Sequence, residues 1–368
     1  MFTDKKLLKN EERAMFALRW LYRQYGYLPY KMSRFEEYDL YVRCKDFLVS
    51  DRIITFSGRN GQLMAMKPDV TLSIIKNAPD EAGAVQKVYY NENVFRMDKG
   101  TGDYQEILQT GLECVGDLTD YEITEVVLLA TKSLAQLGGN FILNLSHMGL
   151  VSRVLADSGL PKSVAARAME CLRQKNRHEL TALCRDADAD PKKLLALLDF
   201  CGAADTVLPG LEAAIGGSAA LEELKAICGI LNQQGFGGNV RLDFSVGNDM
   251  KYYNGVVFRG YLQGIPTSIL TGGQYDRLLT QMGHRGKAIG FAINVDLLER
   301  LEEKPTGFDV DAVLLYSPED APADIAAAAG KIGRDGSVLV AREKPASRRW
   351  RRLWKLEGKE AVLLEDNG

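Results

Sequence analysis

The chain has 368 residues, of which 46% are hydrophobic and 26% are charged. This composition is typical of folded globular proteins and the length suits two or three domains, which excludes a largely disordered chain, a collagen and a disulfide-stabilised miniprotein. Lys and Arg total 46 against 49 Asp and Glu, a net charge of −3, so we expect no global positive field that would attract nucleic acid.

Helical and strand patterns alternate over the first part of the chain. Apolar residues at helical spacing predict helices over residues 5–26 and 120–137. Two β-prone runs around an Asn-Gly turn predict a hairpin over residues 52–76. Alternating polar and apolar residues predict a pair of strands over 84–97 and 105–116.

The pattern changes at about residue 148. Residues 148–236 are rich in Ala and Leu at helical spacing, and strand patterns return from residue 238 onward. One antiparallel sheet interrupted by a helical insertion explains both observations. We therefore expect an α+β core over residues 1–305, followed by a small α/β domain with a largely parallel sheet over residues 306–368.

A basic segment lies inside this last domain. Residues 342–355 contain seven basic residues and one acidic residue, with tryptophans interleaved. We expect an amphipathic surface helix, or a helix that docks on a partner subunit. RNA binding through the interleaved arginines and tryptophans is the alternative.

Several classes of protein lack support in the sequence. No stretch reaches the roughly 20 consecutive apolar residues of a membrane-spanning helix, and the charged N-terminus lacks an apolar signal core, so we expect a cytoplasmic protein with no membrane partner. The six cysteines form no CxxC pair, which favours reduced thiols over a metal site. The common nucleotide, zinc and hydrolase motifs are absent, and we expect no cofactor.

Three segments combine glycines with polar side chains: 95–116, 242–258 and 272–301. The polar residues that stand out in them are Gln109, Glu113, Tyr252, Tyr253 and Tyr275. Carboxylates, an amide and phenols on a glycine-rich platform can hold an ammonium group and a small polar side chain. The alternative is a purely structural set of strand edges, turn glycines and half-buried tyrosines.

These segments, in this order, resemble the catalytic core of histidyl-tRNA synthetases over about residues 5–300. The matching stretches are MKPDVT (66–71), FR (95–96), QTGLECVG (109–116), KYYNGVVF (251–258), GGQYDRLL (272–279) and AIGFAINV (288–295). The resemblance implies a class II aminoacyl-tRNA synthetase-like antiparallel sheet flanked by helices. It also implies that the polar set is a histidine-binding site.

The resemblance assigns one group of residues to the polar atoms of histidine. Asp69 and Thr71 would receive the ammonium group, although a solvated turn after Pro68 is the alternative. Gln109 would hold the amino or carboxylate group. Glu113 would accept a hydrogen bond from the imidazole, and its apolar neighbours in sequence agree with a buried carboxyl that has a partner.

A second group would surround the ligand. Arg96 would contact the histidine carboxylate or a nucleotide phosphate, or would form only a structural ion pair. Tyr252 and Tyr253 are expected to alternate across a strand, so that one faces the ligand and the other lies in the core. Tyr275 would close the imidazole pocket, with a simple packing role as the alternative.

The departures from the family concern the arginines that a ligase needs around ATP. Arg96 keeps the first of them, but the loop that follows has only Lys99 as a cation, and lysine lacks the bidentate fork of arginine. The catalytic arginine aligns with Asn248, and the aspartate before the tyrosines aligns with Lys251. The closing arginine of the third class II motif aligns with Leu297.

A kept histidine site and a dismantled ATP site, with a short C-terminal unit, resemble the synthetase paralogues that act as regulatory subunits of ATP phosphoribosyltransferase. This resemblance implies a non-catalytic protein in the first step of histidine biosynthesis, without catalytic residues or metal of its own. The implied partner is the short-form catalytic subunit, with self-association as a dimer within a hetero-octamer and histidine as feedback effector. The alternatives are a divergent histidyl-tRNA synthetase-like ligase and a histidine-sensing RNA-binding protein.

Overall fold

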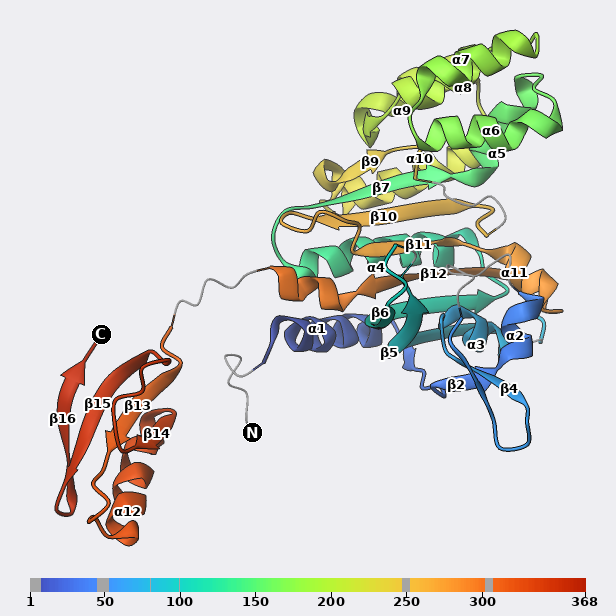
Figure 1. Cartoon of the computed structure of the whole chain (residues 1–368). Helices are drawn as coiled ribbons and strands as arrows, with labels where there is room; N and C mark the ends of the chain where they lie inside the picture. The colour runs from blue at the N-terminus through green and yellow to red at the C-terminus, as the bar shows by residue number, and fades with distance from the viewer. Residues whose placement is uncertain (1–7, 45–52, 80, 99, 247–251, 302–306) are drawn as a thin grey trace. The chain divides into compact units, whose positions relative to one another are not determined.

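The computed structural model describes residues 8–44, 53–79, 81–98, 100–246, 252–301 and 307–368. The chain divides into two compact units, Met1–Leu301 and Glu302–Gly368 (Figure 1). Each unit has a sheet of its own and is described separately.

A nine-stranded sheet forms the centre of the larger unit. Its strands are β1 (Leu28–Pro29), β5 (Val85–Met97), β6 (Tyr104–Gly116), β7 (Phe141–His147), β8 (Gly202–Ala203), β9 (Val240–Leu242), β10 (Val256–Leu262), β11 (Leu270–Gln274) and β12 (Lys287–Asn294). They are arranged in the order β1-β5-β6-β12-β11-β10-β7-β9-β8. All neighbours are antiparallel except the pairs β1–β5 and β7–β9. The expected α+β class with an antiparallel sheet flanked by helices is confirmed.

Two helices, α1 (Asn10–Gln24) and α4 (Asp120–Leu137), pack on one face of this sheet. A capping box fixes the start of α4, because the Thr119 hydroxyl accepts from the backbone of Tyr121 and the Glu122 carboxylate accepts from the backbone of Thr119 at 2.9 Å. Leu112 and Cys114 of β6 point into this helix-covered core. Since side chains alternate along a strand, Glu113 points to the other face.

The helical segment between β7 and β9 is the green and yellow part of Figure 1. It contains α5 (Met148–Asp157), α6 (Lys162–Arg173), α7 (Arg177–Asp186), α8 (Lys192–Asp199), α9 (Ala204–Ile215) and α10 (Ala219–Gln233). The apolar faces of these helices join the main core. His147 caps the first of them, where Nδ1 accepts from the backbone N–H of Leu150 at 3.3 Å.

A small sheet of β2 (Phe35–Glu37), β3 (Thr55–Ser57) and β4 (Leu63–Met66) lies beside the helices α2 (Tyr38–Arg43), α3 (Thr71–Lys76) and α11 (Asp276–Gln281). The predicted hairpin over residues 52–76 is right for the antiparallel pair β3–β4 but wrong at its end, where the chain forms α3. The Asp69 carboxylate accepts from the backbone N–H of Leu72 at 3.2 Å. Leu72, Ile74 and Ile75 then bury a helical face.

The smaller unit contains β13 (Val310–Leu315), α12 (Pro322–Ile332), β14 (Val338–Ala341), β15 (Trp350–Glu357) and β16 (Glu360–Asp366). Its sheet has the order β14-β13-β15-β16. Strand β13 is parallel to both of its neighbours, and only the β15–β16 pair is antiparallel. The largely parallel sheet expected from the sequence is therefore present.

The prediction of a helix in the basic segment 342–355 is wrong, because the second half of this segment belongs to strand β15. Trp354 and Leu356 pack on the side of the sheet that α12 covers, whereas Leu353 packs with Val313 on the other side. This period of two is a strand pattern. Pairing with β13 supplies the backbone hydrogen bonds that favour a strand over a helix here.

The sequence also predicts that the chain has no membrane-spanning helix and that its cysteines are reduced. Among the described residues, none of the helices has the length and apolar character needed to cross a bilayer. All six cysteines are free, and Cys201 is the exposed one. Within the same described ranges, no group of three or more His, Cys, Asp and Glu residues could hold a metal ion.

Candidate functional site

Glycines line the sheet face that carries Glu113. In the strand register Glu113 of β6 lies opposite Gly290 of β12, and Gly290 lies opposite Gly273 of β11. A Cβ atom on Gly290 would overlap the Glu113 carboxyl group, and one on Gly273 would lie 2.7 Å from Cδ1 of Tyr253. The glycines thus provide the space that this carboxyl and this ring occupy.

Glu113 is the hub of the site and is only 2% exposed. The Thr71 hydroxyl donates to its Oε1 at 2.8 Å, and the Tyr275 hydroxyl donates to its Oε2. Burial raises the pKa of Glu113 to about 8, the two hydroxyls oppose the rise, and the nearby Asp69 adds to it. The carboxyl therefore carries a proton for most of the time at neutral pH, and a bound cation would favour its ionised form.

A second buried carboxyl, Asp69, lies beside Arg96. Burial raises the pKa of Asp69, and the Arg96 guanidinium opposes that rise. Nε of Arg96 donates to the carbonyl oxygen of Pro68 at 2.9 Å, which fixes the arginine to the loop that carries Asp69. Burial lowers the pKa of Arg96, and Asp69 counteracts it. Arg96 therefore has both a structural contact and a charge at the site.

Three tyrosine rings meet at these carboxyls. The Tyr252 ring centroid lies 4.5 Å from that of Tyr253 and 5.7 Å from that of Tyr275. Burial raises the pKa of both Tyr252 and Tyr253, and the charges of Asp69 and Glu113 raise it further. Both rings are therefore close to the acidic pair.

The expectation that Tyr252 and Tyr253 alternate across a strand is wrong, because both precede β10 in a turn. Asn254 holds this turn, since its backbone N–H donates to the carbonyl oxygen of Gln274 at 3.0 Å and its side-chain amide donates to Asp276 at 2.9 Å. Outside a strand the rule of alternating faces does not apply, so both rings can reach the cluster.

Gln109 lies on the same face of β6 as Glu113, four residues before it, and is 5% exposed. Its amide donates to Oδ1 of Asn294 at 2.8 Å, the residue opposite it on β12. Contacts and charges link the other seven residues of the expected set, which are Asp69, Thr71, Arg96, Glu113, Tyr252, Tyr253 and Tyr275. Gln109 therefore lies on the same sheet face as the other seven residues, but its side chain is hydrogen-bonded to Asn294.

Two further residues lie at this face and were not predicted from the sequence. Tyr90 of β5 lies opposite Gly111, and a Cβ there would lie 2.5 Å from the Tyr90 hydroxyl. Burial raises the Tyr90 pKa, and Glu113 and Asp69 add to the rise. Arg259 of β10 has a buried Nε without a partner among the described residues. The alternating pattern around Tyr90 predicts which face of the strand its side chain takes. The pattern does not predict that Tyr90 pairs with Gly111.

The resemblance predicts that four positions lack the arginines or the aspartate of a ligase, and the structure describes one of them. Lys99, Asn248 and Lys251 lie outside the described residues. Leu297 lies in the 3-10 helix η4 (Val295–Arg300), where it is half-buried and packs against the main core. Its side chain is apolar and carries no charge.

This sheet, with its glycine-lined face and its flanking helices, has the class II aminoacyl-tRNA synthetase fold. A comparison with protein families shows which class II family this chain belongs to. A family model described as histidyl-tRNA synthetase matches residues 2–298, and the chain belongs to this family.

Individual relatives add detail. An ATP phosphoribosyltransferase regulatory subunit from Alkaliphilus metalliredigens is 26% identical over 330 residues, which cover 85% of this chain and 83% of the relative. A crystal structure described as an ATP phosphoribosyltransferase regulatory subunit/histidyl-tRNA synthetase from Bacillus halodurans superimposes with a TM-score of 0.74 at 23% identity, covering 90% of this chain and 88% of that one. The expected resemblance to the regulatory subunits is confirmed.

A third similar structure is a complex. It is the ATP phosphoribosyl transferase (HisG:HisZ) complex from Thermotoga maritima, with a TM-score of 0.63 at 19% identity. The match covers 77% of this chain and 97% of that chain. At this identity the likeness concerns the fold.

Proposed function

We propose that this chain is a non-catalytic regulatory subunit of ATP phosphoribosyltransferase, which carries out the first step of histidine biosynthesis, and that it senses histidine. The observation that carries the proposal is the buried Glu113, held by the hydroxyls of Thr71 and Tyr275 beside Asp69. In this proposal residues 1–305 are the synthetase-like core, and residues 306–368 are a small C-terminal domain.

Histidine complements the charges of this site. Its ammonium group would lie near the Asp69 carboxylate and the Thr71 hydroxyl, and its imidazole N–H would donate to Glu113. Its carboxylate would pair with Arg96, whose guanidinium is already held by the carbonyl oxygen of Pro68. Tyr252, Tyr253 and Tyr275 supply the aromatic wall, and Gln109 is a further polar contact on the same face.

The proposed absence of ligase activity rests on the residues expected around ATP. Adenylate formation needs positive groups around the phosphates, and the loss of one such group costs about 10²–10³ in rate. At the closing position of the third motif this chain has Leu297, which packs into the core. The proposal therefore leaves catalysis to a short-form catalytic subunit, joined by dimers of this chain in a hetero-octamer.

Feedback inhibition requires that histidine binds the inhibited arrangement of the complex more tightly than the active one. The ratio of the two affinities sets the largest possible shift between the arrangements. The relative from Thermotoga maritima, whose structure is described as a complex of this enzyme, supports such an assembly.

The first test is a calorimetric titration of the purified chain with L-histidine. We expect one site per chain, and Asp69→Asn should weaken binding by at least about tenfold, because a charged hydrogen bond contributes about 1.5–3 kcal/mol. The matched control is Asp39→Asn in α2, an exposed carboxylate that should leave the affinity unchanged.

The second test adds a short-form catalytic subunit. The chain should raise its activity, histidine should inhibit the mixture, and Asp69→Asn should keep the first effect while losing the second. A chain that neither binds histidine nor changes the activity contradicts the proposal. Histidine-dependent ATP–pyrophosphate exchange by the chain alone would instead support the ligase alternative.

A further inference from the structure

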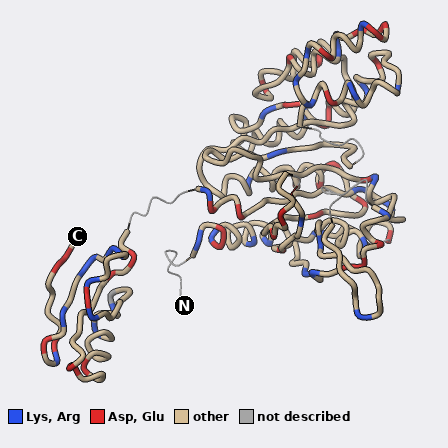
Figure 2. The backbone as a smooth tube through the Cα atoms, in the orientation of Figure 1, with Lys and Arg blue, Asp and Glu red and all other residues tan. Residues whose placement is uncertain are grey.

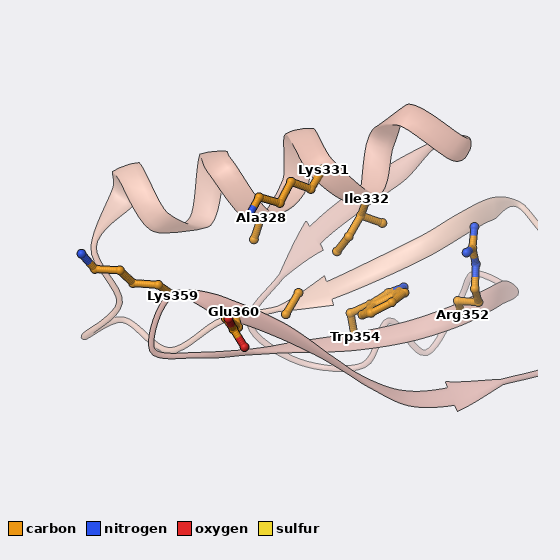
Figure 3. Close-up of a pocket in the computed structure, with 8 residues that line it drawn as sticks. Ala328, Lys331, Ile332, Arg352, Trp354, Lys359 and Glu360 are labelled. Atoms are coloured by element: carbon orange, nitrogen blue, oxygen red, sulfur yellow. The ribbon is translucent and has the colours of Figure 1, made fainter.

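The smaller unit has a pocket between helix α12 and the β15–β16 hairpin (Figure 3). Its volume is about 370 Å³, in the range of small-molecule sites. The side chains that matter for its chemistry are Lys331, Ile332, Arg352, Trp354, Lys359 and Glu360. This pocket lies wholly within one compact unit and is separate from the residues proposed to bind histidine.

Positive charge dominates the pocket. Lys331 of the helix, Arg352 of β15 and Lys359 of the hairpin turn line it, against the single carboxylate Glu360. Figure 3 shows these cations spread along the pocket, with Arg352 at one end and Lys359 at the other. The lining therefore favours an anion.

Two buried hydrogen-bond donors in the pocket wall lack acceptors. Nε of Arg352 and Nε1 of Trp354 are inaccessible to solvent and have no partner among the residues that the structure describes. Buried polar groups in proteins are nearly always hydrogen-bonded, and exceptions call for an explanation. A ligand acceptor can reach the two donors only if the Arg352 and Trp354 side chains shift as it binds, and an acceptor-rich ligand that does so would satisfy both.

The rest of the wall is apolar and planar. The Trp354 ring packs with Ile332 and Ala328 of α12 in the core of this unit. Figure 3 shows the ring between Arg352 and Glu360 along the strands that form the floor. A flat, partly aromatic ligand gains from contact with an indole, and an adjacent arginine suits its phosphate.

We propose that this pocket binds a nucleoside monophosphate, with the phosphate at Arg352 and the base against Trp354. A single small nucleotide fits the charges better than an extended nucleic acid does. The hairpin also carries the exposed carboxylates Glu357, Glu360 and Asp366, which would repel neighbouring phosphates of a polymer. Figure 2 shows basic and acidic positions together on this hairpin.

The experiment is a calorimetric titration of the full chain with AMP, followed in parallel by tryptophan fluorescence. AMP should bind, and Arg352→Gln should weaken binding at least tenfold. The matched control is Arg351→Gln, an exposed arginine that is next in the chain and points away from the pocket, because strand side chains alternate. It should change the affinity less than twofold.

Further probes test each part of the ligand. Trp354→Phe should abolish the fluorescence change and weaken AMP, while far-ultraviolet circular dichroism verifies that the variant is folded. Adenosine and inorganic phosphate should each bind at least tenfold more weakly than AMP. The proposal is overturned if AMP does not bind at millimolar concentration, if Arg351→Gln weakens it as much as Arg352→Gln, if phosphate binds as well as AMP, or if a single-stranded RNA oligonucleotide binds more tightly.

Discussion

The raised pKa of Glu113 makes the stability of the larger unit depend on pH. In the folded chain this carboxyl has a pKa of about 8, against an ordinary value of 4.5, because it is buried. The folded state therefore holds a proton that the unfolded state releases between these two pH values. A group of this kind contributes its full stabilisation below pH 4.5 and loses it as the pH rises to about 8.

The size of this effect follows from the same two pKa values. Each pH unit in the interval removes about 1.4 kcal/mol, so the whole interval removes at most about 5 kcal/mol. Glu113→Gln has nearly the same shape and no charge to bury. Its unfolding free energy should lack this fall, so the variant should gain several kcal/mol relative to the wild type between pH 5 and pH 9.

The assay is urea unfolding of both proteins at a series of pH values, followed by circular dichroism. The control is Glu81→Gln, which neutralises an exposed carboxyl in the same unit and should keep the wild-type pH dependence. If the unfolding free energies of the wild type and Glu113→Gln change with pH in parallel, Glu113 titrates normally. This result would refute the inference that Glu113 is protonated at neutral pH.

Three further variants test the packing. Gly290→Ala should lose histidine binding and about 1–3 kcal/mol of stability, because the added methyl group overlaps the Glu113 carboxyl; calorimetry and thermal melting measure both. Lys67→Met should cost about 2 kcal/mol in urea unfolding, since it leaves Glu92, now 2.8 Å from the fully buried ammonium, without its partner. Gly330→Ala in α12 meets no atom within 4 Å and should stabilise the smaller unit by up to about 1 kcal/mol; an unchanged or lower melting temperature would contradict this.

The long strands and helices were predictable because their patterns are local. Residues 84–97 and 105–116 alternate over many positions, and the structure has β5 and β6 there in antiparallel register. The helix predicted over residues 342–355 is wrong because charged residues between tryptophans suit a helix as well as a strand. Its choice of β15 depends on β13, about 40 residues earlier, through a pairing that a local pattern cannot reveal.

The site shows the same division between local and distant information. Its residue types came from a resemblance in several short segments, whereas their contacts are long-range: Thr71 lies 42 residues from Glu113, and Tyr275 lies 162 residues from it. The turn that places Tyr252 and Tyr253 depends on Gln274 and Asp276 of another strand and helix. Such contacts follow from the sheet register, which the sequence leaves open.

The protonated state of Glu113 also explains how the site can exist without its ligand. Two ionised carboxyls as close as Asp69 and Glu113 would repel each other in a buried place, but one proton on Glu113 relieves the repulsion. A histidine that places its ammonium group and its imidazole there would favour the ionised form and displace that proton. Gly290, opposite Glu113, leaves room for the Glu113 carboxyl group in either state. Under the proposed function, this sheet face holds histidine for sensing, since recognition of the amino acid requires none of the charges that ATP needs.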